Sequence, residues 1–162
     1  MHNPTLSFTQ SLTALSKILD KAEAHAEAKK IKPEVIPQLR LIADMLPFWR
    51  QITIACDHAK GASARLAGIE VPSFADTETT IVELKERIAK TIAFMATIPA
   101  SAYDKGEDRT ITLKLGGQDR SFPAMHYYLS VAIPNFYFHM TTAHAILRTN
   151  GVDIGKSDFI GA

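Results

Sequence analysis

The stretch from Phe48 to Gly68, FWRQITIACDHAKGASARLAG, decides the fold. Apolar side chains recur along it at intervals of three and four residues, which is the period of a helix with one buried face. Pro47 marks a break in front of it, and Gly68 supplies a C-terminal stop. We therefore predict a long amphipathic helix over 48–67 whose apolar side other helices must cover.

Three further segments show the same helical period. They are residues 6–30, 79–97 and 123–149, and the last of them contains Pro134, at which we predict a kink. A short helix is also predicted over about 34–45. Four long helices of this kind predict an all-α fold, an antiparallel four-helix bundle.

The helical period is interrupted between the third and fourth long helices. Residues 110–115 alternate polar and apolar side chains, and Gly116-Gly117 and residues 120–122 follow. This pattern predicts a small β-hairpin. Because an isolated two-stranded ribbon is marginally stable in water, the hairpin should pack against the helices. The chain shows no repeat or linker, so we predict a single domain over residues 1–162.

Composition excludes several classes of function. The formal net charge of +1 argues against a nucleic-acid-binding surface. No apolar run approaches the roughly 20 residues of a membrane span, and the N-terminus shows no basic-then-apolar secretion signal. We therefore expect a cytoplasmic protein without membrane or nucleic-acid partners. The single cysteine, Cys56, is expected to be an inert buried side chain.

Several sequence blocks together resemble the DinB/YfiT-like superfamily, and within it a functionally uncharacterised branch. The resemblance covers nearly the whole chain and is most distinctive in its last third. The matching blocks are Gln51-Ile52, Asp57-His58-Ala59-Lys60, Ala64-Arg65-Leu66-Ala67-Gly68, Pro134-Asn135-Phe136-Tyr137-Phe138-His139, Ala145-Ile146-Leu147-Arg148 and residues 150–159.

The resemblance implies where a site would lie. Many members of the superfamily bind a divalent metal such as zinc, nickel or iron through three histidines, one from the second long helix and two from the fourth. In this chain the corresponding positions hold Gln51, Asn135 and His139. Amide side chains bind first-row transition metals weakly compared with imidazole. This departure from the family pattern favours a hydrogen-bonding pocket with no cofactor, in the space that the metal occupies elsewhere.

Two other side chains border the predicted site. His58 lies two helical turns after Gln51 on the same face, which makes it the one candidate to replace a missing metal ligand, although surface exposure is commoner for such a histidine. Tyr128 belongs to the aromatic residues that precede Pro134 and is assigned to the ligand-binding pocket. His139 itself has two interpretations, a ligand-facing residue and a histidine at the edge of the core that a carbonyl or carboxylate satisfies.

Three hypotheses of function follow. The favoured one is a small-molecule-binding protein or vestigial enzyme, because two of the three expected imidazoles are missing. The alternative is a metal-dependent transferase or isomerase with His139 and His58 as ligands. The third is a structural or stress-related dimer. Aromatic side chains over residues 136–138 cannot all face inward, which favours a homodimer under any of the three.

Three further local features are predicted from the sequence. Asp57 and Lys60 lie three residues apart and should pair on a helix surface. The segment after Gly151 contains Ile154 and Phe159, which makes it too apolar for a free tail. We predict that it folds back onto the bundle with Phe159 buried. The inward face of the last helix is predicted to include Leu129.

Overall fold

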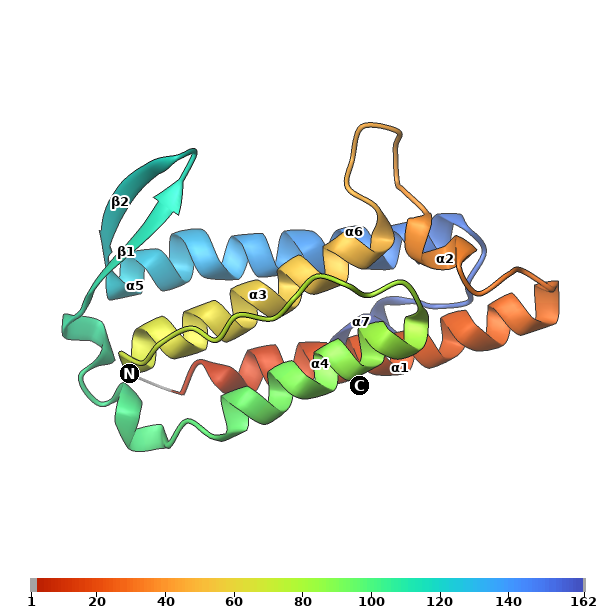
Figure 1. The fold of residues 1–162 in the computed structure, drawn as a ribbon. Helices are drawn as coiled ribbons and strands as arrows, with labels where there is room; N and C mark the ends of the chain where they lie inside the picture. Colours follow the sequence, from red (N-terminus) through yellow and green to blue (C-terminus); the bar gives the residue numbers. More distant parts are fainter. Residues whose placement is uncertain (1–2, 162) are drawn as a thin grey trace.

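The computed structural model describes residues 3–161 and is mostly helical with one small hairpin, as predicted. Figure 1 shows the four longest helices running alongside one another. Within the described residues these are α1 (Thr5–Lys29), α3 (Phe48–Ala67), α4 (Ile81–Ala96) and α6 (Ile133–Thr149). The shorter helical elements are α2 (Val35–Gln38), α5 (Ala124–Tyr127), α7 (Lys156–Ile160), the 3-10 turns η1 (Ala100–Tyr103) and η2 (Gly106–Asp108), and the π-helical turn η3 (Tyr128–Ala132).

Helix α3 occupies the centre of the packing. It contacts α4, α6, α1 and α2, and it is lined by small side chains such as Ala55, Ala59 and Ala62, which are fully buried. Small side chains allow neighbouring helices to approach closely, so α3 is covered on more than its apolar stripe. Gly68 ends the helix in the left-handed conformation, with φ 72°.

The predicted helix over 34–45 is wrong in its extent. Only Val35–Gln38 is helical, and Leu39 is extended, with ψ 145°. The chain from 40 to 47 then forms a loop that projects from the helices (Figure 1). The loop is closed at its neck, where the Phe48 amide donates to the Leu39 carbonyl at 2.7 Å. Its exposed side chains include Leu41 and Ile42, which bury no apolar face that would hold a longer helix.

The kink at Pro134 takes the form of a π-helical turn over Tyr128–Ala132. Proline has no amide hydrogen, so the carbonyl four residues earlier, that of Ser130, loses its helical donor and the backbone adjusts around it. The wider turn rotates the residues before Pro134 relative to those after it. The prediction that Leu129 faces inward is therefore wrong, and its side chain is 55% exposed.

The hairpin consists of β1 (Thr110–Leu115) and β2 (Gln118–Pro123), antiparallel with Thr110 opposite Pro123. Gly116 and Gly117 form its turn, both with positive φ, as a tight two-residue turn requires. As predicted, the hairpin packs on the helices, because Ile111 is buried. At its base, the guanidinium of Arg109 donates to the carbonyls of Leu66 and Ala67 at 3.2 Å each.

The C-terminal segment folds back, as predicted, and α7 packs against α1. Val152 and Ile154 are buried in the core. Phe159 packs against the core, as predicted, but it is only half-buried and not fully buried. An ion pair between Lys21 Nζ and Asp158 Oδ1, at 2.7 Å, also ties α7 to α1. Along residues 3–161 no helix combines the length and apolar character that a membrane crossing requires.

The buried part of this segment should matter for stability. Ile154 is 4% exposed, whereas Ile160 is 46% exposed. We expect Ile154→Ala to lower the free energy of unfolding by about 2–5 kcal/mol, and the melting temperature by roughly 5–15 °C. The matched variant Ile160→Ala should leave the melting temperature close to that of wild type. Calorimetry measures both, and equal shifts in the two variants would contradict the packing described.

Candidate functional site

Helices α3 and α6 bring two of the predicted site residues into direct contact. Gln51 on α3 is buried, and its Oε1 lies 2.7 Å from Nδ1 of His139 on α6. The Nε2 of Gln51 donates to the carbonyl of Leu46, at 2.9 Å. This second bond fixes the orientation of the amide, since only its nitrogen can donate to a carbonyl. Gln51 Oε1 therefore accepts a hydrogen bond, and His139 carries its proton on Nδ1.

The electrostatic environment keeps His139 neutral. Burial, together with the nearby His58 and the positive charge of Arg50, lowers the pKa of His139 from 6.5 to about 4. With Nδ1 protonated, Nε2 presents a free lone pair. This Nε2 makes no hydrogen bond within residues 3–161, and the surrounding protein does not enclose it completely. Nε2 of His139 is thus a hydrogen-bond acceptor open to solvent.

His58 lies beside this pair. Its ring stacks on that of His139, with the centroids 5.9 Å apart and an interplanar angle of 17°. Burial lowers the pKa of His58, an effect that the neighbouring Asp57 opposes. On the other side, the exposed ring of Phe138 meets His139 edge-on, with centroids 5.2 Å apart. The junction of α3 and α6 therefore brings together two imidazoles and an exposed aromatic ring.

The other two predicted site residues form no hydrogen bond to Gln51 or His139 within residues 3–161. Asn135 is exposed, and its Nδ2 donates to the carbonyl of Val131 at 2.7 Å, one turn back along the chain. Tyr128 lies against α1, where its ring meets Phe8 edge-on at 6.2 Å. Tyr128 belongs to the π-helical turn, and the rotation at that turn separates it from the face that carries His139. The structure thus unites Gln51, His139 and His58, without Asn135 or Tyr128.

This arrangement does not fit a three-ligand metal site of the kind that many members of the DinB/YfiT-like superfamily have. Both ends of the Gln51 amide are occupied, and its oxygen faces an N–H group, where a cation would be repelled. In the part of the chain that the structure describes, no three His, Cys, Asp or Glu side chains are grouped to hold an ion. Cys56 is buried, and burial raises the pKa of its thiol to about 12, so it is a protonated side chain as expected.

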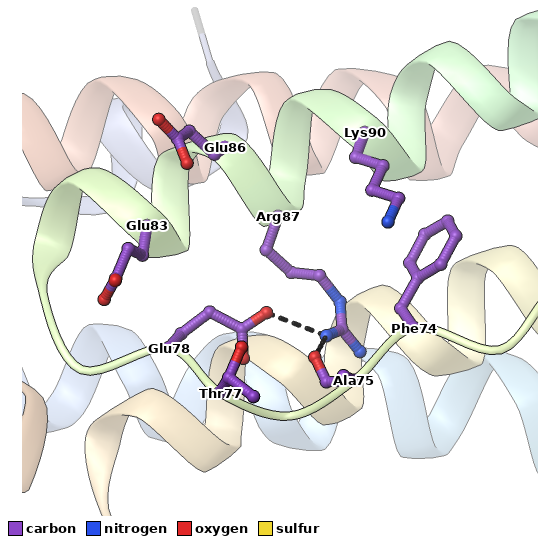
Figure 2. A pocket seen from close by; sticks show the side chains of 8 residues that line it. All are labelled: Phe74, Ala75, Thr77, Glu78, Glu83, Glu86, Arg87 and Lys90. Carbon is purple, nitrogen blue, oxygen red and sulfur yellow. Dashed lines mark hydrogen bonds and ion pairs between the residues drawn. The ribbon is translucent and has the colours of Figure 1, made fainter.

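A second polar centre surrounds Arg87 on α4, and the sequence analysis missed it. The Arg87 side chain is 2% exposed, and its guanidinium binds Asp57 at 3.0 Å, Asp76 at 3.2 Å and Glu78 at 2.8 Å. It also donates to the carbonyl of Ala75 at 2.9 Å, and Figure 2 shows this bond and the one to Glu78. These partners lie 9 to 30 residues away from Arg87 in the sequence, so the spacing of residues within one helix does not predict them.

The ion pair between Asp57 and Lys60, next to Arg87, was predicted, but as a pair on the helix surface. Lys60 and Asp57 do pair, at 2.9 Å, yet the Lys60 side chain is only 5% exposed. The predicted surface pair is therefore buried only at its Lys60 end, since the Asp57 side chain is 41% exposed, and Asp57 also binds Arg87. The spacing of three residues predicts that Asp57 and Lys60 pair. The burial of Lys60 depends on the helices that pack around α3, which the spacing does not show.

The protonation of His139 can be measured directly. We expect ¹⁵N-labelled histidine spectra to show His139 protonated on Nδ1 and titrating with a pKa of about 4. Because this pKa lies below the ordinary value, the unfolded chain binds more protons between the two values. The loss of stability should therefore grow as the pH falls from about 6.5 to about 4, and level off below that. His139→Phe should reduce this loss.

A variant of Gln51 tests whether its amide fixes the tautomer of His139. In Gln51→Leu, the Nδ1–H of His139 loses its acceptor, and the ring should exchange between its two tautomers. His126→Gln, at an exposed position, should leave the His139 signals unchanged. A wild-type His139 with its proton on Nε2 would refute the orientation of the Gln51 amide.

Comparisons with known proteins agree with this fold. Residues 4–160 match the model of a family described as a domain of unknown function, DUF1993, and the chain belongs to that family. A crystal structure of a DinB family member protein from Shewanella denitrificans is 40% identical, with a TM-score of 0.90, over 98% of this chain and 89% of that one. The comparison with curated proteins finds no match. The resemblance to an uncharacterised DinB-like branch is thereby confirmed.

Proposed function

We propose that this member of the family binds a small molecule in the groove between α3 and α6, at a site that has lost the ligand set of a metal enzyme. The proposal includes the architecture of the site, in which the four long helices form a single antiparallel bundle of the DinB/YfiT type. The observation that carries the proposal is the 2.7 Å hydrogen bond between His139 and Gln51, whose amide is itself held by Leu46.

The chemistry of the groove favours a particular kind of ligand. A neutral imidazole with a free Nε2 accepts a hydrogen bond, so the ligand should carry an N–H or O–H donor. The exposed ring of Phe138 next to His139 supplies apolar contact for the remainder of the ligand. Small-molecule sites commonly combine a few placed polar groups with an apolar lining. An uncharged molecule with one donor group on an apolar body fits this arrangement best.

Paired ligands provide the test. Untagged protein would be screened by thermal shift against a library in which each small alcohol or amide is matched with its O- or N-methylated analogue. We expect some donors to raise the melting temperature and their methylated analogues to have little effect, because binding to the native state stabilises it by mass action. The shift should disappear in His139→Ala and persist in His126→Ala. A library without any His139-dependent shift would refute the proposal.

Elemental analysis distinguishes this function from its alternative. We expect untagged protein to carry substoichiometric zinc, nickel or iron, and a chelator to leave its melting temperature unchanged. One equivalent of metal that is lost in His139→Ala or His58→Ala would instead favour a metal-dependent transferase or isomerase. His25→Ala, at a histidine outside the groove, is the control for non-specific metal loss.

We also propose that the chain forms a homodimer. Leu129 and Phe138, both carried by the last helical segments, are 55% and 56% exposed, and apolar side chains of this size are commonly covered in an interface. Light scattering should give twice the chain mass, and Leu129→Ser should shift the protein toward monomer. Leu6→Ser, at a 72% exposed position on α1, should not. A wild-type monomer at high micromolar concentration would contradict the proposal.

A further inference from the structure

A cavity of about 320 Å³ lies between α4 and the segment that precedes it, away from the groove of His139. Figure 2 shows its lining, in which Glu83, Glu86, Arg87 and Lys90 come from α4, and Phe74 and Glu78 come from the preceding segment. Small-molecule sites in proteins begin at about this size.

Two buried polar atoms in this lining have no partner. The side chains of Glu78 and Arg87 are 9% and 2% exposed. Within residues 3–161, Glu78 Oε2 and Arg87 Nε form no hydrogen bond. Leaving such a group unpaired is energetically costly, and native proteins pair nearly all of them with protein, water or ligand. Because one atom is an acceptor and the other a donor, a single molecule that pairs with both would have to offer both a donor and an acceptor.

The charges around the cavity are separated by sign. In Figure 2 the carboxylates of Glu78, Glu83 and Glu86 lie to one side of Arg87, and Lys90 lies to the other. The Lys90 ammonium sits 4.2 Å from the ring centroid of Phe74, and it forms no ion pair with any carboxylate among the described residues. Since Asp57 and Asp76 also balance Arg87, the cavity is acidic at one end and basic at the other.

We propose that this cavity binds a small zwitterion of the amino-acid class. Its ammonium group would donate to Glu78 Oε2 and face Glu86, and its carboxylate would accept from Lys90 and from Arg87 Nε–H. Charge-assisted hydrogen bonds of both signs would then satisfy the two unpaired atoms at once. A singly charged ligand would satisfy one end of the cavity and leave the other unpaired.

Ligands matched in length test the charge pattern. Isothermal titration calorimetry would compare glycine, β-alanine and 4-aminobutyrate with butylamine and butyrate. We expect saturable binding of at least one zwitterion, with butylamine and butyrate each weaker by about tenfold or more. If no zwitterion binds, or if butylamine or butyrate binds as well as the best zwitterion, the proposal is wrong, and water alone satisfies the two buried atoms.

Variants locate the binding. Lys90 and Glu86 are exposed, so Lys90→Met and Glu86→Gln should fold normally, which an unchanged circular dichroism spectrum would verify. Lys90→Met should lower the affinity for the best zwitterion to about that of butylamine, by roughly tenfold. Lys17→Met, on an exposed face of α1, is the matched control and should bind as wild type does. Wild-type affinity in Lys90→Met would overturn the assignment to this cavity.

Discussion

Helix α3 is enclosed by protein along most of its length, and the buried polar side chains that it carries must find partners within the protein. Its buried positions include Gln51, Lys60 and Ser63 as well as the apolar stripe. A buried polar group without a partner is costly, and a buried charge more so. Much of the polar structure of the molecule follows from this constraint. Ser63 meets it locally, by donating to the Ala59 carbonyl, and so does Lys60, by pairing with Asp57. Gln51 requires a distant partner, His139 on α6.

The two polar centres lie where α3 meets different neighbours. Toward α6, neutral groups suffice, because the amide of Gln51 pairs with one imidazole and one backbone carbonyl. Toward α4, the burial of Lys60 next to Asp57 leads to a charged network, which Arg87 extends to Asp76 and Glu78. Such buried charges contribute little net stability compared with apolar packing. They do fix the path of the segment before α4, to which three of the Arg87 hydrogen bonds run.

The sequence predicts those features that depend on local periodicity. The extents of α1, α3 and α4, the hairpin and the returning tail follow from apolar spacing and from turn residues. The contact of Gln51 with His139 follows from the family resemblance combined with their helical faces. Tyr128 could not be placed in the same way, because a regular 3.6-residue period was assumed across Pro134. One wider turn before the proline shifts every earlier side chain to another face. Asn135 follows the proline on the same helix as His139, but its amide is used locally, in a hydrogen bond to the Val131 carbonyl.

Arg87 shows a different limit of the sequence. Its spacing on α4 is that of an inward-facing position, next to Ile88 and Leu84, where an arginine is unusual. That irregularity is the signal that could have identified the second centre. It could not have identified the partners, since Asp57 and Glu78 come close only when α3, α4 and their connection pack together.

Gln51 also connects the site to the projecting loop. Its Nε2 holds the Leu46 carbonyl at one end of the loop, next to the neck where the Phe48 amide donates to Leu39. A ligand that donates to Nε2 of His139 makes the Nδ1–H a stronger donor, because hydrogen bonds in a chain polarise one another. The amide of Gln51 transmits that polarisation to Leu46. The loop over 40–47 is therefore tied to His139 through the hydrogen bonds of Gln51.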